Sequence, residues 1–229
     1  MFYTVNVQTG DRTLIKQLTG ASSGSTSINA IGYNALDYNL YAIQANVNPP
    51  KVIKIGAQGQ EVDVFQLPVS LGTLLGVTSY NVGDVDENGV YWISNAGRAW
   101  AQIDIANQRI ISQGIAVLTN AVYDWAYVPG GGNYLYAVNT DSSGNAYLYR
   151  FDRSAHTWGQ VGSGYGNLFG AAGTLGAAYA ERDGSLYVSD NTSGKIYKCS
   201  LNGSTATFVK TGPTASANDG AHCILNGSA

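Results

Sequence analysis

A unit of about 45 residues recurs along this chain, and this repeat limits the possible folds more than any other feature. Residues 177–211 show the unit most clearly: a strand of small residues, an Asp-Gly turn, an aromatic strand at 186–188, a further strand at 196–199 and an alternating tail at 206–209. Each part is short and bounded by Gly, Asn, Asp or Ser, which is typical of antiparallel strands and hairpins. The unit therefore predicts four short strands.

Copies of this unit align on the tyrosine of the second strand. These tyrosines are 50, 45 and 51 residues apart: Tyr41, Tyr91, Tyr136 and Tyr187. The third strands fall at 52–55, 101–104, 148–151 and 196–199, and residues 2–10 fit the same column. The first strands fall at 29–33, 81–85, 124–128 and 176–180, with a fifth copy at 219–223. The chain thus ends with the start of the unit that its N-terminus finishes.

Repeats of four short strands at this period are typical of propeller blades, because one such sheet must pack between neighbours to bury both faces. We predict an all-β, five-bladed β-propeller in one domain, residues 1–229, with the closing blade shared between the N- and C-termini. The expected blades span 28–74, 76–118, 121–168, 174–214, and 215–229 with 1–18. The second strand of the closing blade is expected from residues 224–229 or from residues preceding Met1 in the natural precursor.

The amino-acid composition agrees with one all-β domain and argues against two classes of binding partner. Only 12% of the 229 residues are charged, whereas 29 are Gly and 16 are Tyr, so turns and half-buried aromatic strands dominate. A net charge of −3, with Lys and Arg scattered singly, argues against nucleic acid and against an anionic membrane surface. No apolar run is long enough for membrane insertion.

The location of the protein in or outside the cell is inferred from its N-glycosylation sequons and its cysteines. Three sequons in predicted turns, at Asn191, Asn202 and Asn226, favour a secreted, extracellular protein. A strand directly follows Met1, as in a chain whose signal peptide has been removed. Cys199 and Cys223 fall on different blades, too far apart to pair, and are expected as buried thiols unless Cys223 has an upstream partner.

One column of the repeat carries side-chain oxygens at the start of the innermost strands, and Gly176 is its one blank. Its members are Asn29, Asn81, Asp124 and Asp219. Innermost strands line a propeller's channel, so we expect a ligand-binding ring at one channel mouth. Oxygen ligands alone would favour Ca²⁺ or Mg²⁺ over zinc, and no other cofactor is expected. Alternatively, these groups hydrogen-bond nearby backbone.

Three positions further along the column lie Asp84, Tyr127, Tyr179 and His222. An acid, phenols and an imidazole suit proton transfer, in β-elimination of a uronic acid or in hydrolysis with Asp84 and Asp86. Successive strand residues face opposite sides, so these residues are expected to pack between blades instead of meeting. Asp84 and His222 join the ligand-binding candidates, and no catalytic residue is assigned.

Other candidate motifs lack the spacing or the neighbouring helix that their function would require. His156 and His222 lack metal-ligand spacing, and no CxxC is present, so a zinc site is not expected. A Gly-x-Ser-x-Gly elbow before a helix is also missing. Aromatic side chains with Asn, Gln and Ser neighbours suit the binding of sugar rings, although most are expected in the core. The aromatic candidates are Tyr33, Tyr80, Trp92, Trp100, Tyr123, Trp125 and Tyr165.

The segments INAIGYNALDYNLYAI, NVGDVDENGVYWIS, LYRFD, FYTVNVQTGDRTLI and NDGAHC resemble an uncharacterised family of secreted, mostly fungal, propeller-type domains. The resemblance covers nearly the whole chain and implies blades, not a reaction. Size and blade count are also similar to those of the tachylectin-like lectins, by fold analogy alone.

These observations favour a secreted, non-catalytic binding module with a lectin-like function, whose partner is a glycan or another cell-surface ligand. The alternatives are a polysaccharide-acting lyase or hydrolase with its site at the channel, and a structural wall or matrix protein. The sequence leaves the oligomeric state open.

Overall fold

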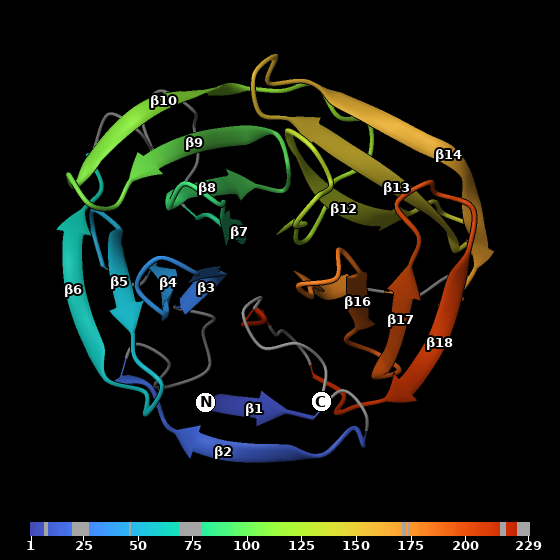
Figure 1. The fold of residues 1–229 in the computed structure, drawn as a ribbon, viewed down its shortest axis with the longest axis horizontal. Coiled ribbons are helices and arrows are strands. Elements are labelled where there is room, and N and C mark those ends of the chain that lie inside the picture. Colours follow the sequence, from blue (N-terminus) through green and yellow to red (C-terminus); the bar gives the residue numbers. More distant parts are fainter. Residues whose placement is uncertain are drawn as a thin grey trace.

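The computed structural model describes residues 1–6, 9–19, 28–45, 47–68, 79–170, 173, 175–215 and 219–223. In these parts of the chain, eighteen β-strands form five antiparallel sheets. The same parts contain no helix long and apolar enough to cross a membrane. Figure 1 shows the sheets arranged in a circle, with the strands of each sheet following one another outward from the central axis. The fold is an all-β propeller, as the repeat predicts.

Four sheets have four strands each, paired in chain order, and are numbered here as blades 1 to 4. Blade 1 contains β3 (Ile28–Asn34), β4 (Asn39–Gln44), β5 (Lys51–Ile55) and β6 (Glu61–Gln66). Blade 2 contains β7 (Val82–Val85), β8 (Val90–Asn95), β9 (Ala99–Asp104) and β10 (Arg109–Ile115). Blade 3 contains β11 (Ala126–Tyr127), β12 (Tyr134–Thr140), β13 (Asn145–Asp152) and β14 (Trp158–Asn167). Blade 4 contains β15 (Leu175–Ala180), β16 (Leu186–Asp190), β17 (Lys195–Cys199) and β18 (Ala206–Thr211).

Burial falls from the axis outward, which explains the composition of each strand. Almost every residue of the innermost strand β15 is buried, whereas the outermost strand β18 is mostly exposed and alternates. The turns between strands use glycine where the backbone must be left-handed, as at Gly89 (φ 72°) and Gly184 (φ 82°). The Asn-Gly and Asp-Gly pairs of the repeat are therefore the hairpin turns that set the strand register.

The cores lie between neighbouring sheets. Apolar residues of blades 1 and 2 form one cluster around Ile43 and Ile93, and those of blades 2 and 3 form another around Trp92, Trp125 and Phe151. Further clusters join blade 3 to blade 4, and β1 and Leu18 to blade 1. Blades 1, 2 and 3 thus bury apolar residues on both faces against neighbouring sheets, and blade 4 does so on the face toward blade 3.

The innermost strands of blades 1 and 2 approach so closely that only glycine fits between them. A Cβ added at Gly32 would lie 2.6 Å from the Cα of Asp84, and one added at Gly83 would meet the backbone of Ala30. Such contacts cannot be relieved by turning a side chain, because backbone atoms form both sides. The glycines at positions 32 and 83 therefore follow from the packing of β3 against β7.

The fifth sheet contains β1 (Phe2–Val5) and β2 (Arg12–Lys16), and has two strands in the described part of the chain. Residues 219–223, predicted as a first strand, form no strand, so that prediction is wrong. Gly220 and Ala221 favour strands weakly, and the carboxylate of Asp219, not a backbone ladder, attaches this segment to blade 1. The second strand expected from 224–229 and the blade boundary at 69–78 lie outside the described residues. Cys199 and Cys223 are free thiols.

Candidate functional site

Three aspartates line the channel at the inner ends of different blades. Asp84 belongs to β7, Asp124 lies just before β11, and Asp219 belongs to the C-terminal segment. Asp124 is buried, and the other two are half-buried. Electrostatic coupling among the three carboxylates indicates that they share one region of the channel.

Each carboxylate makes the same pair of hydrogen bonds. One oxygen accepts the N–H of the next residue along the chain, at 2.8 to 2.9 Å. The other accepts, at 2.7 Å, an N–H from the innermost strand of the following blade. The donors are Tyr127 to Asp84, Ala178 to Asp124, and Ile31 to Asp219. The carboxylates therefore join neighbouring blades across the channel wall.

Local backbone irregularities direct two of these N–H groups. The β3–β4 register shifts between Asn29 and Gly32, and Ala30 has a left-handed backbone (φ 58°). This bulge points the Ile31 N–H at Asp219 and the Ala30 carbonyl at the hydroxyl of Tyr91, which donates to it. A similar shift in β15, before Ala177, precedes the Ala178 N–H that bonds Asp124.

Burial in the channel raises the pKa values of these three aspartates. Loss of hydration is the main cause that raises the pKa of Asp84 to about 7 and that of Asp219 to about 8. Loss of hydration also raises the pKa of Asp124 well above its usual range, and the charge of Asp219 adds to this rise. The backbone N–H groups act in the opposite direction by favouring the ionised form. The net effect of burial in the channel is to favour the protonated form of these acids.

The amide members of the predicted ring lie differently from the acids. The side-chain oxygen of Asn29 accepts its neighbour's N–H, from Ala30 at 3.0 Å, as the aspartates do. The side-chain oxygen of Asn81 accepts the Ala96 N–H at 2.9 Å and so supports the β8–β9 turn. Asn81 thus follows the alternative expected for this column, a polar side chain that bonds nearby backbone.

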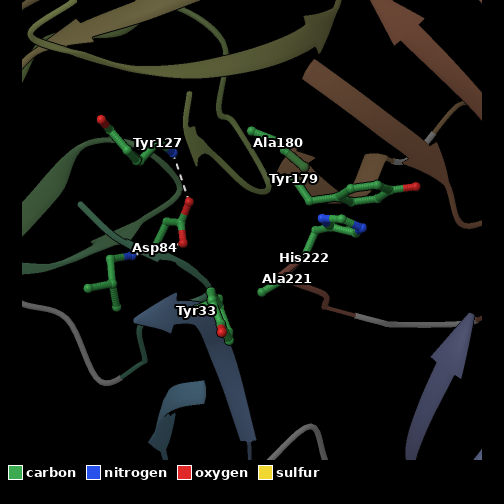
Figure 2. Close-up of a pocket in the computed structure, with 9 residues that line it drawn as sticks. Tyr33, Asp84, Tyr127, Tyr179, Ala180, Ala221 and His222 are labelled. Atoms are coloured by element: carbon green, nitrogen blue, oxygen red, sulfur yellow. Dashed lines mark hydrogen bonds between the residues drawn. The ribbon is translucent and has the colours of Figure 1, made fainter. Parts of the chain in front are cut away.

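A small cavity lies beside Asp84 on the channel axis (Figure 2). Its lining includes four members of the repeat column that contains His222, together with Tyr33 from the next position. These residues are Tyr33, Asp84, Tyr127, Tyr179 and His222. The prediction that these residues would not meet is wrong for Tyr179 and His222, whose rings stack. The Tyr127 ring packs between blades 2 and 3 beneath Arg153, as predicted. The innermost strands are short and meet near the axis, so side chains from several blades reach one space.

An aromatic stack forms one wall of this cavity. The rings of Tyr179 and His222 are nearly parallel at 6.1 Å, and Tyr187 continues the stack at 5.6 Å behind Tyr179. The Nδ1 atom of His222 has no hydrogen-bond partner among the described residues. The stack holds the C-terminal segment against blade 4.

This cavity is too small for a sugar ring. Its volume is about 10 Å³, which is room for about one water molecule. Each oxygen of these aspartates already accepts a backbone N–H group, so part of their capacity to bind a ligand is used. The described residues contain no group of three or more His, Cys, Asp or Glu that could hold a metal ion. The channel geometry suits bound water and blade linkage better than substrate binding.

A larger hollow, the blade 1–2 groove, opens on the surface between blades 1 and 2. It has a volume of about 530 Å³, within the range of ligand sites. Exposed apolar side chains line it, namely Leu36, Val62 and Ile111. Its polar lining includes Asp37, Lys54, Asp63, Asn88, Asp104 and Gln108. Sequence reasoning missed this groove, because its walls come from turns and outer strands of two different repeats.

Sequence reasoning also missed an ionic cluster that joins blades 2 and 3. The buried Arg153 donates to Asp86 at 2.7 Å and to both oxygens of Glu87 at 2.8 and 2.9 Å. The indole N–H of Trp92 donates to the same oxygen of Asp86 at 2.9 Å. The acidic Asp86-Glu87 hairpin signalled this cluster, but the arginine lies more than sixty residues away in sequence.

Most of the aromatic residues considered for sugar binding are in the core. Tyr123 is exposed, whereas the other six are buried. Of the sequons, Asn202 is exposed in the β17–β18 turn, but Asn191 is only 7% exposed, so its expected accessibility is wrong. Asn226 lies outside the described residues.

Solved structures with the same fold differ widely in sequence. A Bacteroides thetaiotaomicron protein of unknown function aligns with 84% of this chain at 13% identity and a TM-score of 0.62. Virginiamycin B lyase from Staphylococcus aureus aligns with 82% at 16% identity and a TM-score of 0.50, and the RRP9 WD40 repeats with 81% at 12% and 0.53. The chain spans about half of each of these structures, namely 53%, 56% and 52%. At such identities the similarity shows the fold alone.

No curated protein matches the sequence. A family model does match, over residues 1–225 and so over most of the chain. The chain belongs to the family described as a repeat of unknown function, DUF6923.

Proposed function

We propose that this protein is a secreted, non-catalytic binding module whose ligand is a carbohydrate on a cell surface or in an extracellular polymer. The observation that carries the proposal is the contrast between the two hollows. The channel cavity has room for about one water molecule. The blade 1–2 groove has about 530 Å³ and combines apolar side chains with amides and charged groups. Sugars need this combination, since they have both C–H faces and hydroxyl groups.

The test is a glycan array, followed by thermal unfolding with each glycan that binds. Binding should raise the melting temperature in proportion to ligand excess over Kd. Val62, 51% exposed in the groove, should be replaced by tryptophan to fill it, with Val117→Trp as a control at a 92% exposed site outside the lining. We expect only Val62→Trp to abolish binding. An array without hits and without a thermal shift would remove the lectin proposal.

The finer architecture belongs to the same proposal. We propose that β1 and β2 are part of a fifth blade, with residues 219–223 at its inner position. The bond from the Ile31 N–H to Asp219 and the position of β1 and β2 between blades 4 and 1 support this arrangement. The secreted, fungal-type and lectin-like character rests on the resemblance and on the sequons, of which Asn202 is exposed.

A polysaccharide-acting enzyme at the channel is a second candidate. It is supported by Asp84, whose pKa is raised to about 7 beside a cavity that His222, Tyr33 and Tyr179 also line. The test compares depolymerisation of uronate-containing polysaccharides by the wild type and by a His222→Ala, Asp124→Asn double variant. Activity that the double variant retains in full would eliminate this candidate.

A further inference from the structure

The acids of the blade 1–2 groove already have partners within the protein. Asp63 forms an ion pair with Lys51 at 2.7 Å, and Asp104 accepts from Arg109 at 3.1 Å. Asp37 accepts from the hydroxyl of Tyr41 at 2.6 Å. The negative charges of the groove are therefore compensated or hydrogen-bonded before a ligand arrives.

Among the residues that the structure describes, Lys54 is the one cationic side chain in the groove lining. It is half-buried on β5, opposite Tyr41 on one side and Val62 on the other. Among the described residues, it forms neither a hydrogen bond nor an ion pair. Its ammonium group therefore faces the groove without a partner.

The repeat provides internal comparisons for this lysine. The residue opposite the second-strand tyrosine is also cationic in blades 3 and 4, namely Arg150 and Lys198. Arg150 lies over the ring of Tyr134 at 4.2 Å, and Lys198 pairs with Asp183 at 3.5 Å. The two copies thus have partners inside their own blades, whereas Lys54 lacks one. A partner from outside the chain would complete the same pattern in blade 1.

We propose that the blade 1–2 groove binds a uronic acid residue of an oligosaccharide, and that Lys54 pairs with its carboxylate. This inference rests on the proposed function and names its ligand class. A singly charged carboxylate fits better than a phosphate dianion, because the single ammonium group of Lys54 can neutralise one negative charge but not two.

The rest of the lining matches a sugar ring that carries such a carboxylate. Leu36 and Ile111, 64% and 46% exposed, offer apolar surface to the C–H face of the ring. The side-chain amides of Asn88 and Gln108 are exposed and can both donate to and accept from hydroxyl groups. An acidic peptide would use the lysine equally but would leave these amides without a comparable set of hydroxyls.

The experiment measures binding of tetragalacturonate and of its methyl ester to the full chain by titration calorimetry. The ester keeps the ring and the hydroxyls but removes the charge. We expect the acid to bind about 10 to 100 times more tightly than the ester, the usual range for one charge-assisted hydrogen bond. Lys54→Gln should abolish this preference, and Lys54→Arg should retain it. Lys198→Gln, the equivalent change in blade 4, should have no effect.

Several results would overturn the inference. They are equal affinity for acid and ester, a preference that survives Lys54→Gln, failure of both oligosaccharides to bind, and tighter binding of an acidic peptide such as tetraglutamate. The fate of the proposed function is separate. If neutral glycans bind and Val62→Trp blocks them, the lectin proposal stands while the uronate inference fails.

Discussion

The channel carboxylates predict that this protein is more stable in mild acid than in mild base. The pKa values of Asp84 and Asp219 rise on folding, to about 7 and about 8. A raised pKa means that the folded state binds more protons than the unfolded state between about pH 4 and pH 8. Stability is therefore fully present below the unfolded-state pKa and is lost as the pH rises through the folded-state pKa.

The expected change in the free energy of unfolding follows from the size of the pKa shift. For Asp84, a rise from 3.8 to about 7 corresponds to about 4 kcal/mol at 1.36 kcal/mol per pH unit. Asp219 extends the decline to about pH 8, and because Asp124 and Asp219 interact, their contributions do not simply add. We take about 4 kcal/mol as the upper limit for Asp84 alone, since it is partly exposed to the channel.

The assay is chemical denaturation at pH 5 and at pH 8, in the same buffer system and at the same ionic strength. The free energy of unfolding should be several kcal/mol higher at pH 5. Asp84→Asn should reduce the difference by up to about 2.7 kcal/mol, because only the two pH units between pH 5 and the folded-state pKa of about 7 contribute within this range. Asp11→Asn, on the exposed hairpin before β2, is the matched control and should leave the difference unchanged. Equal stability at both pH values, or greater stability at pH 8, would refute the reasoning.

Two further predictions concern the contacts between blades. Arg153→Ala should lower the free energy of unfolding by about 3 to 5 kcal/mol, because buried Asp86 loses its ion partner; Arg109→Ala, which breaks an exposed pair, should cost less than about 1 kcal/mol. Denaturant midpoints of the two variants check this contrast, and equal losses would contradict it. Gly32→Ala should destabilise by about 1 to 3 kcal/mol or prevent folding, because its Cβ would meet the β7 backbone. Gly159→Ala, with open space around it, should be neutral, and thermal unfolding of both variants provides the comparison.

Strands were predictable from this sequence because their signals are local. Short apolar strands separated by turn residues occur in every copy, with Asn-Gly or Asp-Gly turns in blades 2 and 4, and the four columns correspond to the strands of blades 1 to 4. The predicted strand at residues 219–223 was wrong because this segment resembles a first strand in sequence. In the structure, its attachment to Ile31 is made by the side chain of Asp219. The alignment of the repeat does not distinguish a strand from a segment that occupies the place of one.

The site was harder to predict, because backbone bulges decide which groups meet. Asp84 and Asp124 are three positions apart in the repeat column, yet both carboxylates bond the following blade in the same way. The register shift before Gly32 changes which N–H groups face the channel, and no residue type announces it. The blade 1–2 groove likewise depends on how blades 1 and 2 are placed, which is a property of the ring and not of one repeat.

A repeat protein provides its own controls for separating structure from function. Groups that recur with the same partner in several blades, such as the channel carboxylates with their backbone N–H donors, are explained by the assembly of the ring. A repeated group that lacks in one copy the partner it has in the others requires another explanation. Lys54 is such a group, since Arg150 and Lys198 are satisfied within their blades. If the protein binds a ligand through a single site, the copy that breaks the pattern of pairing is where its charge should be recognised.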